Sequence, residues 1–218
     1  NGIFLFGSEL KALRSYKYFS NSVDKGALSL YMKYMYVPSP YSIFENIYKL
    51  DPGCILQIDE SGVSTPPKKI ISSVFDDKGI SIKQWYSLSK VAKNSQNNLV
   101  KDESEAIYLL EKTLLKSVQS QLISDVPLGA FLSGGIDSSL IVALMSNICS
   151  HPIKTFTIGF EESGFNEAVY AKAVARHLNT EHHELYVTSK EALEVIPNLP
   201  SLYDEPFADS SQIPTYLV

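Results

Sequence analysis

The chain has 218 residues, a formal net charge of −5 and 44% hydrophobic side chains, which is typical of a folded globular protein with one large domain or two smaller ones. Its 19 Lys and Arg residues are scattered and form no basic patch, so nucleic acid is not an expected partner. No apolar run approaches the roughly 20 residues of a membrane-spanning helix, and no signal-peptide pattern opens the chain, so a membrane partner is not expected. The two cysteines lie outside any CxxC pair, and a reducing, cytoplasmic setting is expected.

Residues 1–88 predict short strands and one helix. The apolar run GIFLFGSEL is typical of a strand, and DKGALSLYMKYMY predicts a helix with an apolar face and with Asp24 as its N-cap. LDPGCILQIDESG predicts a strand between a Pro-Gly turn and a Ser-Gly turn, and KQWYSL is a further short strand candidate.

A polar stretch at residues 89–102, rich in Lys, Asn, Ser and Gln, has the composition of a linker, and we expect a domain boundary there. In residues 103–218, helical patterns (ESEAIYLLEKTLLKSVQSQLI, DSSLIVALMSNI, NEAVYAKAVARHL, TSKEALEVIPNL) alternate with strand candidates (VPLGAFL, IKTFTIGF, HHELYV). Asn166 is expected to cap the third helix, and Thr188 with Glu191 to form a capping box on the fourth. This alternation predicts βαβ units and a parallel sheet.

The stretch FLSGGIDSS stands at the turn between a predicted strand and a predicted helix. Gly134 and Gly135 let the backbone turn sharply and approach a bulky anion, and the first turn of the helix presents free N–H groups that favour negative charge. The stretch is neither a Walker A loop nor a GxGxxG motif. A carboxylate among phosphate donors would repel the ligand unless it holds a cation, so Asp137 is expected to contact Mg²⁺. The alternative is a plain strand–turn–helix in which Asp or Ser caps the helix.

SGGIDSS resembles the pyrophosphate loop of the PP-loop ATP pyrophosphatases, which adenylate a substrate and release pyrophosphate. Together with SDVPLGAFL before it, and with FNEAVYAKAVARHLNTEHHELYV and YDEPFADSSQIPTYLV after it, the loop resembles that of the glutamine-dependent asparagine synthetases. Upstream, GSELKAL, YVPSPYSIFENIYKLDPGCIL and QWYSL resemble the last part of the glutaminase domain of that family.

The resemblance implies an α/β fold in two truncated parts. Residues 1–88 would be the C-terminal half of an N-terminal-nucleophile glutaminase domain, mostly β. Residues 103–218 would be the N-terminal part of a parallel-sheet, adenine-nucleotide α-hydrolase-like synthetase domain.

The resemblance also implies ATP and Mg²⁺ as cofactors. Asp137 is the expected catalytic and metal-binding residue, and the loop would hold the β- and γ-phosphates of ATP. Leu132 and Ile158 would contact the adenosine, although both also fit plain core packing. The expected nucleotide-binding residues are Leu132, Ser133, Gly134, Gly135, Asp137, Ser138, Ser139 and Ile158.

The implied reaction activates the side-chain carboxylate of aspartate as an acyl-adenylate, releases pyrophosphate and lets ammonia from glutamine attack the acyl carbon. Mg²⁺ and the N–H groups of the loop would spread the charge that builds up. Three alternatives stay open: amidation of another carboxylate, on a sugar or a secondary metabolite; a β-lactam-synthetase-like cyclisation; and a nucleotide-binding module without turnover. A homodimer, common in that family, is left open as well.

Asp204, Glu205 and Asp209 in YDEPFADSS form a second acidic cluster. It would either bind Mg²⁺ or substrate, or be a solvated turn in which Asp209 and Ser210 cap a helix. The Thr- and Arg-containing stretch that related enzymes can carry here to recognise aspartate is absent, which leaves the acceptor acid open.

Adjacent residues on a strand point to opposite faces, so His182 and His183 are expected to have structural roles and not to bind zinc. The chain starts at Asn1 and ends on TYLV within a pattern, which indicates a piece of a longer protein. The nucleophilic Cys and the glutamine-binding motifs of the related glutaminases are missing, as are an SGEGADE-type loop and a catalytic Lys. This piece alone is therefore expected to be inactive.

Overall fold

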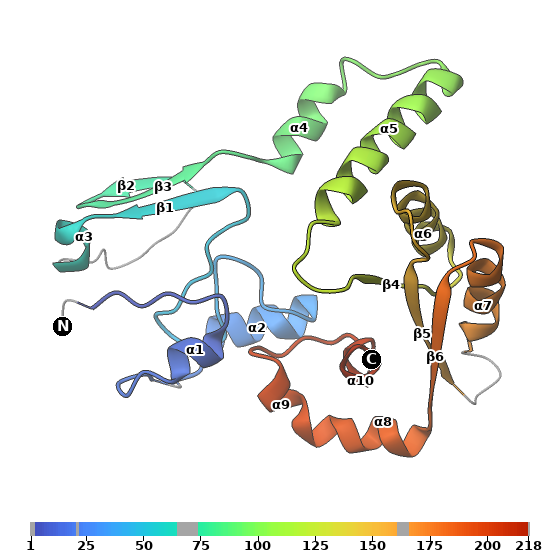
Figure 1. Cartoon of the computed structure of the whole chain (residues 1–218). Helices are drawn as coiled ribbons and strands as arrows, with labels where there is room; N and C mark the ends of the chain where they lie inside the picture. Colours follow the sequence, from blue (N-terminus) through green and yellow to red (C-terminus); the bar gives the residue numbers. More distant parts are fainter. Residues whose placement is uncertain (1–2, 21, 65–73, 161–165, 218) are drawn as a thin grey trace. The chain divides into compact units, whose positions relative to one another are not determined.

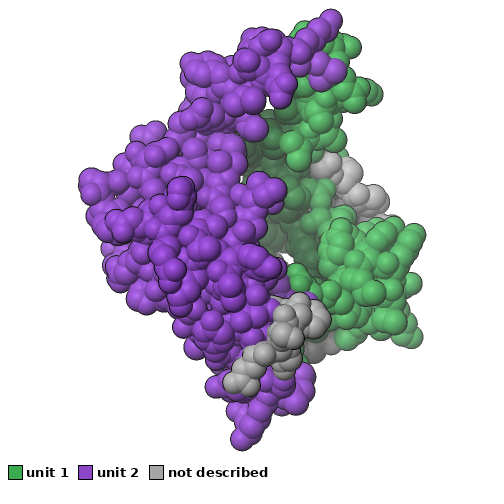
Figure 2. All heavy atoms as spheres, turned by 90° about the vertical axis from the view of Figure 1, so that its right-hand side faces the viewer, with its two compact units in different colours: residues 1–98, 198–209 green, residues 99–197, 210–218 purple. Residues whose placement is uncertain are grey.

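The computed structural model describes residues 3–20, 22–64, 74–160 and 166–217. The chain divides into two compact units, which Figure 2 shows in different colours. The first unit consists of residues 1–98 and 198–209, and the second of residues 99–197 and 210–218. Among the described helices, none has the length and apolar composition that crossing a membrane requires.

The first unit combines an antiparallel sheet with short helices (Figure 1). The strands are β1 (Cys54–Ile58), β2 (Phe75–Asp77) and β3 (Ile80–Gln84), in the order β1-β3-β2. The helices are α1 (Leu10–Arg14), α2 (Lys25–Tyr34), α3 (Glu60–Ser64), α4 (Leu88–Ser95) and α9 (Leu199–Leu202). A small core of Ala27, Val37 and Ile43 holds α2 against the loop that follows it.

The predicted helix at DKGALSLYMKYMY is confirmed as α2, with Asp24 as its N-cap. The Asp24 carboxylate accepts a hydrogen bond from the N–H of Ala27 at 3.0 Å. The helix ends at Met35, whose φ of +67° is left-handed, a common way for a helix to stop. The strand predicted within LDPGCILQIDESG is confirmed as β1.

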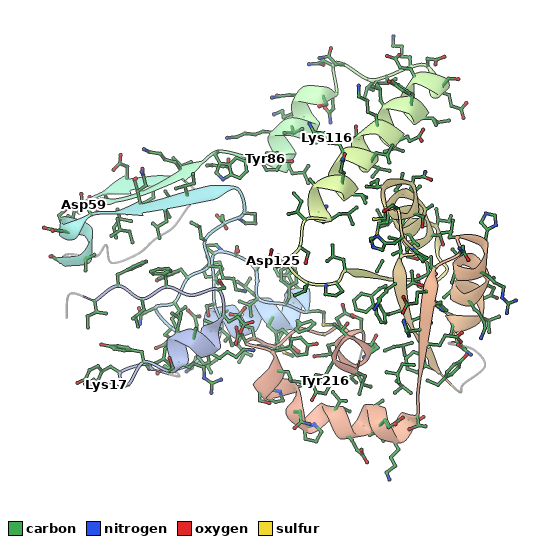
Figure 3. The ribbon with its side chains drawn as sticks, viewed as in Figure 1. Lys17, Asp59, Tyr86, Lys116, Asp125 and Tyr216 are labelled. Carbon is green, nitrogen blue, oxygen red and sulfur yellow. The ribbon has the colours of Figure 1, made fainter. Side chains whose placement is uncertain are left out.

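Three elements expected in this unit differ in the structure, either in type or in position. GIFLFGSEL forms no strand in its described residues, because none of the described strands lies beside it to exchange backbone hydrogen bonds. The expected Ser-Gly turn is part of α3, because the Asp59 carboxylate, at the junction of β1 and α3 (Figure 3), accepts the N–H groups of Ser61 and Gly62 at 2.9 and 3.0 Å. KQWYSL straddles the end of β3, and the N–H groups of Trp85 and Tyr86 turn to the carbonyl of Gly53.

The polar stretch expected as a linker contains helix α4. Ser87 is its N-cap and accepts the N–H of Lys90 at 3.4 Å. None of the residues of α4 is buried, so capping and local propensity support it more than packing does.

The second unit contains the predicted parallel sheet, with strands β4 (Gly129–Phe131), β5 (Lys154–Phe160) and β6 (Glu181–Val187) in the order β4-β5-β6 (Figure 1). The alternation of strand and helix is confirmed. The helices are α5 (Glu103–Gln121), α6 (Ile136–Ile148), α7 (Ala168–His177), α8 (Ser189–Val195) and α10 (Gln212–Leu217). A 3₁₀ turn, Ile196–Asn198, leads from α8 into the first unit.

The caps of the second unit follow the sequence closely. The predicted capping box of α8 is confirmed, since Thr188 and Glu191 each accept the backbone N–H of the other. Helix α7 begins one residue later than expected, with Glu167 at the N-cap position. Asn166 still contributes, because its side-chain oxygen accepts the N–H of Ala168 at 3.1 Å.

Helix α6 takes part in both core clusters of the second unit. Leu144 and Met145 pack with Val118 of α5, while Val142 packs with Leu132 and with two alanines of α7. The contact of Val142 with Leu132 holds α6 beside the end of β4, where the Gly-rich stretch lies.

Candidate nucleotide-binding site

The FLSGGIDSS stretch forms a tight turn between β4 and α6. Leu132 leaves the sheet with its N–H bonded to the carbonyl of Phe156 at 2.8 Å. Gly134 has a φ of +80°, and a Cβ there would lie 2.6 Å from Cβ of Tyr170 and 2.7 Å from the backbone nitrogen of Ala171. Only glycine fits at this position, because the backbone is left-handed and α7 lies directly against it. Gly135 occupies the N-cap position of α6 and offers no side-chain cap.

Serine hydroxyls fix the shape of this turn. The hydroxyls of Ser133 and Ser138 lie 3.0 Å apart, and the Ser138 hydroxyl accepts the N–H of Ser133 at 3.3 Å. The Ser133 hydroxyl in turn accepts the N–H of Gly135 at 3.3 Å. The loop is thus held by its own side chains, while the first N–H groups of α6 have no partner within the helix.

Ser139 adds a buried polar atom that needs a partner. Its hydroxyl oxygen is inaccessible to solvent, and no described group forms a hydrogen bond with it. An unpaired buried hydroxyl costs roughly 1–3 kcal/mol. Because this hydroxyl lies in the first turn of α6, beside free N–H groups, it fits a site that accepts an oxygen-rich anion.

Asp137 is exposed in the first turn of α6, and no described side chain pairs with it. Within the described residues, no group of three or more His, Cys, Asp or Glu side chains could enclose a metal ion. Mg²⁺ is commonly held in proteins by one or two carboxylates, with phosphate oxygens and water completing the coordination, so the contact between Asp137 and Mg²⁺ stays a prediction.

The two expected adenosine contacts lie near the loop. Ile158 is a half-buried residue of β5, two residues beyond Phe156, whose carbonyl binds Leu132. Leu132 itself is 1% exposed, and its side chain packs in the core. Any contact of Leu132 with a ligand would therefore be made by its main chain. The structure therefore brings loop, Leu132 and Ile158 to the carboxyl edge of the parallel sheet, where open α/β sheets bind ligands.

The loop itself is open to solvent, since Ile136 is 87% exposed. A hollow of about 560 Å³ in the second unit lies at the opposite edge of the sheet, between Leu128, Lys154 and Glu181. The loop thus provides a cradle for an anion and not an enclosed pocket.

The acidic cluster has a role that the sequence did not predict. Both carboxylate oxygens of Asp204 accept backbone N–H groups at the start of α1: that of Leu10 at 2.6 Å and that of Lys11 at 3.1 Å. Glu205 accepts the N–H of Ile43 at 2.7 Å and pairs with Lys49. No sequence signal pointed to these partners, because Leu10 is 194 residues from Asp204 and Ile43 is 162 residues from Glu205 in the chain. Helix α10 begins at Gln212, so neither Asp209 nor Ser210 directly precedes it.

The two adjacent histidines have different partners, as strand alternation predicts. Nδ1 of His182 lies 2.9 Å from the Thr155 hydroxyl, and burial lowers the pKa of His182. The ring of His183 stacks on Phe156, and its Nε2 lies 3.2 Å from a carboxylate oxygen of Glu181.

Two family models match the chain. The model described as "Asparagine synthase" matches residues 109–218, which include the loop and the acidic cluster. The model described as "Glutamine amidotransferase domain" matches residues 1–69.

Several curated proteins are similar to the chain along most of its length. A protein of Methanocaldococcus jannaschii, named "Putative asparagine synthetase 2" and glutamine-hydrolyzing, is 34% identical over 218 residues, which cover 99% of this chain and 38% of the relative. Asparagine synthetase 1 of Bacillus subtilis, also glutamine-hydrolyzing, is 34% identical over 198 residues, which cover 90% of this chain and 27% of the relative. The glutamine-hydrolyzing asparagine synthetase B of Escherichia coli K12 is 34% identical over 127 residues, or 52% of this chain and 21% of the relative. The chain thus spans at most 38% of the length of these relatives.

Proposed function

Because the chain belongs to the asparagine synthase family, we propose that the protein in which it occurs uses ATP to convert the side-chain carboxylate of aspartate into an amide. The ammonia would come from glutamine, which the match to a glutamine amidotransferase model at residues 1–69 supports. AMP, pyrophosphate and glutamate would be the other products. The relatives with which it aligns are named glutamine-hydrolyzing asparagine synthetases, which supports the same reaction.

The observation that carries this proposal is the turn between β4 and α6. Its left-handed Gly134 removes any side chain from the point of closest approach, and the unpaired Ser139 hydroxyl lies in the adjacent helical turn. We assign the β- and γ-phosphates of ATP to the N–H groups and hydroxyls of this turn. The position of the turn at the carboxyl edge of a parallel sheet supports that assignment.

In the reaction, an oxygen of the aspartate side chain attacks the α-phosphorus, and the bond from this phosphorus to the bridging oxygen of pyrophosphate breaks. Ammonia then attacks the acyl carbon and loses a proton, and AMP leaves with the former carboxylate oxygen. Mg²⁺ would supply positive charge at the phosphates. Asp137 would hold it, and the amino end of α6 would stabilise the negative charge on the departing pyrophosphate.

The residues beside the loop would orient the nucleotide. The main chain at Leu132 and the side chain of Ile158 would contact the adenosine and place the α-phosphorus toward the acceptor acid. The setting proposed for this chemistry is the cytoplasm, where ATP, Mg²⁺ and glutamine are available.

The test adds ATP, Mg²⁺ and aspartate, with either glutamine or ammonia, to the full-length protein and measures pyrophosphate, AMP and asparagine. Formation of all three supports the proposal. Pyrophosphate release with another acid alone would identify a different acceptor, and a product without new nitrogen would indicate a cyclase. No release with any acid would indicate a nucleotide-binding module without turnover.

Replacing the proposed metal-binding carboxylate gives a sharper version of the test. Asp137→Ala is expected to lower pyrophosphate release by at least about a hundredfold, as removal of one group that stabilises transition-state charge commonly does. Glutamine hydrolysis by the same variant should remain measurable, because residue 137 lies outside the glutamine amidotransferase match. Equal pyrophosphate release by variant and parent would contradict the role of Asp137.

A further inference from the structure

Residues 198–209, here called the return segment, belong to the first compact unit although they follow the parallel sheet in the chain. They lie within the asparagine synthase match, whereas the rest of the unit contains the whole glutamine amidotransferase match. The region matched to amide formation therefore supplies a piece of the unit matched to glutamine hydrolysis.

The return segment is bound to three separate parts of the first unit. At α1, Asp204 accepts two backbone N–H groups, and the ammonium group of Lys11 donates to the carbonyl of Leu202 at 3.1 Å. In the loop after α2, Glu205 accepts the N–H of Ile43 and pairs with Lys49.

The third part is the end of α2. The N–H of Ala208 donates to the carbonyl of Met35, the left-handed residue that ends this helix, at 2.8 Å. Within the segment, the rings of Tyr203 and Phe207 pack edge to face at 4.9 Å between centroids. This ring contact lies between the bonds that Asp204 and Ala208 make to the rest of the first unit.

Asp204 supplies a cap that helix α1 lacks, and Glu205 ties down a neighbouring loop. Helix α1 has only five residues, none of them buried, and the side chain at its own N-cap, Glu9, forms no capping bond. Asp204 provides this cap from 194 residues away, and a carboxylate at a helix amino end forms charge-assisted hydrogen bonds. The Glu205 side chain is only 14% exposed, and Lys49 also donates to the carbonyl of Val37 at 2.7 Å, so the ion pair ties the segment to a partly buried network.

We propose that Asp204 and Glu205 are positioning residues that clamp the two matched regions together, so that ammonia released from glutamine is delivered to amide formation instead of to the solvent. This inference rests on the proposed function. Ammonia that escapes into neutral water becomes protonated and can no longer attack an acyl carbon. Delivery of ammonia therefore requires the two matched regions to be held in a fixed arrangement. Because both carboxylates already bind N–H groups or a lysine, they serve as the clamp and not as a metal site.

The experiment compares Asp204→Asn and Glu205→Gln with the parent in the full-length protein. Asparagine formation is measured once with glutamine and once with free ammonia, together with glutamate release. Asn and Gln keep the size of the side chain but lose one acceptor oxygen and the charge. Glu194→Gln is the control, since Glu194 is an exposed residue of α8 whose ion pair with Lys190 is long, at 3.9 Å.

The expected result is a loss of coupling. Loss of one charge-assisted hydrogen bond shifts an equilibrium by roughly ten- to a hundredfold, so the amide formed per glutamate released should fall about tenfold or more in both variants. Rates with free ammonia and rates of glutamate release should stay within about twofold of the parent, as in Glu194→Gln. Lys49→Arg, which keeps the charge opposite Glu205, should retain coupling, and Lys49→Met should lose it.

Hydrogen exchange of the intact proteins provides a readout that does not depend on catalysis. Freed from Asp204 and Glu205, the N–H groups of Leu10, Lys11 and Ile43 should exchange faster in the respective variants. Unchanged exchange at these groups would overturn the clamp, whatever the activity of the variant.

The remaining outcomes are also decisive. Unchanged coupling in both variants would overturn the inference, and so would a proportional loss of the glutamine- and ammonia-dependent rates, which indicates a merely structural role. If the parent itself makes no amide from either glutamine or free ammonia, the proposed function fails and the coupling role with it, while the exchange measurement still decides whether the clamp exists.

Discussion

Gly134 allows the loop to turn where no other residue fits. Its φ of +80° is unfavourable for residues with a side chain, and a Cβ would lie 2.6–2.7 Å from atoms of Tyr170 and Ala171. Gly134→Ala is therefore expected to lower the free energy of unfolding by about 1–3 kcal/mol. Urea unfolding of the full-length protein, followed by a probe in the parallel sheet, measures this change.

Gly135→Ala is the matched control. Gly135 has a φ of −71°, and a Cβ there would meet only the Ser133 hydroxyl, at 3.3 Å. Its free energy of unfolding should stay within about 0.5 kcal/mol of the parent. Equal destabilisation by the two substitutions would show that the left-handed backbone of Gly134 is not what shapes the loop.

The two groups of residues with proposed roles differ in how far the sequence could predict them. The loop occupies consecutive residues between two strongly patterned elements, so its composition and its setting were both visible in the sequence. The partners of Asp204 and Glu205 were not visible, because the bonds to Leu10 and Ile43 span 194 and 162 residues. A carboxylate that caps a distant helix has the same local sequence as one that binds a cation or faces solvent.

Strand β6 contains a buried network that makes folding sensitive to acid. Nδ1 of His182 lies 2.9 Å from the Thr155 hydroxyl, which lies 2.8 Å from that of Thr180. Burial lowers the pKa of His182 below its ordinary value of 6.5, and the charges of Lys172 and His183 act in the same direction, against the opposite effect of Glu184. His182 therefore binds a proton more weakly in the folded chain than in the unfolded chain.

The sign of the pH effect follows from this difference. The contribution of His182 is fully present above pH 6.5 and is lost as the pH falls from there toward its folded pKa. We expect the urea midpoint of the parent to fall over this interval, and His182→Gln to fall less. Parallel curves for parent and variant would contradict the prediction.

The carboxylate of Glu184 affects stability at lower pH than His182 does, so the two contributions can be measured separately. The hydrogen bond from Lys172 lowers the pKa of Glu184 below its ordinary 4.5, with a further hydrogen bond from Tyr186. The stability that Glu184 contributes is therefore present above pH 4.5 and lost below it. The comparison of His182→Gln with the parent belongs above that pH.

The elements of the second unit were predictable because their patterns are local. Helices α6 and α7 each bury several apolar residues at helical spacing, and β5 is rich in β-branched and aromatic residues, whereas the short helix α10, with none of its residues buried, was not predicted. GIFLFGSEL has a similar apolar composition but forms no strand in its described residues, since a strand depends on a neighbour that its own sequence does not specify. Helix α4 was missed for the opposite reason: its residues are polar, and its Ser87 cap supports it without burial.

For the molecule as a whole, the order of the chain and the order of its compact units differ. The chain leaves the first unit after residue 98, returns for residues 198–209 and leaves again. The sequence does not indicate that the chain returns to the first unit, because YDEPFADSS has the composition of an ordinary polar turn between helices. The first unit is therefore complete only when a segment that follows the parallel sheet has been made.

This organisation predicts how shortened chains behave. A chain of residues 1–209 retains the return segment, whereas a chain of residues 1–197 lacks it, and both lack α10. The shorter chain should lose hydrogen-exchange protection at Leu10, Lys11 and Ile43, whose N–H groups bind Asp204 and Glu205.

The amide of Leu132, which bonds to Phe156 within the parallel sheet, provides the internal control and should be equally protected in both chains. Equal protection of Leu10, Lys11 and Ile43 in the two chains would mean that the first unit holds these groups without the return segment. A parallel loss at Leu132 would mean that the truncation unfolds the molecule generally. Loss confined to the first unit is expected, because the bonds from Leu202, Asp204 and Glu205 to Leu10, Lys11 and Ile43 end within that unit.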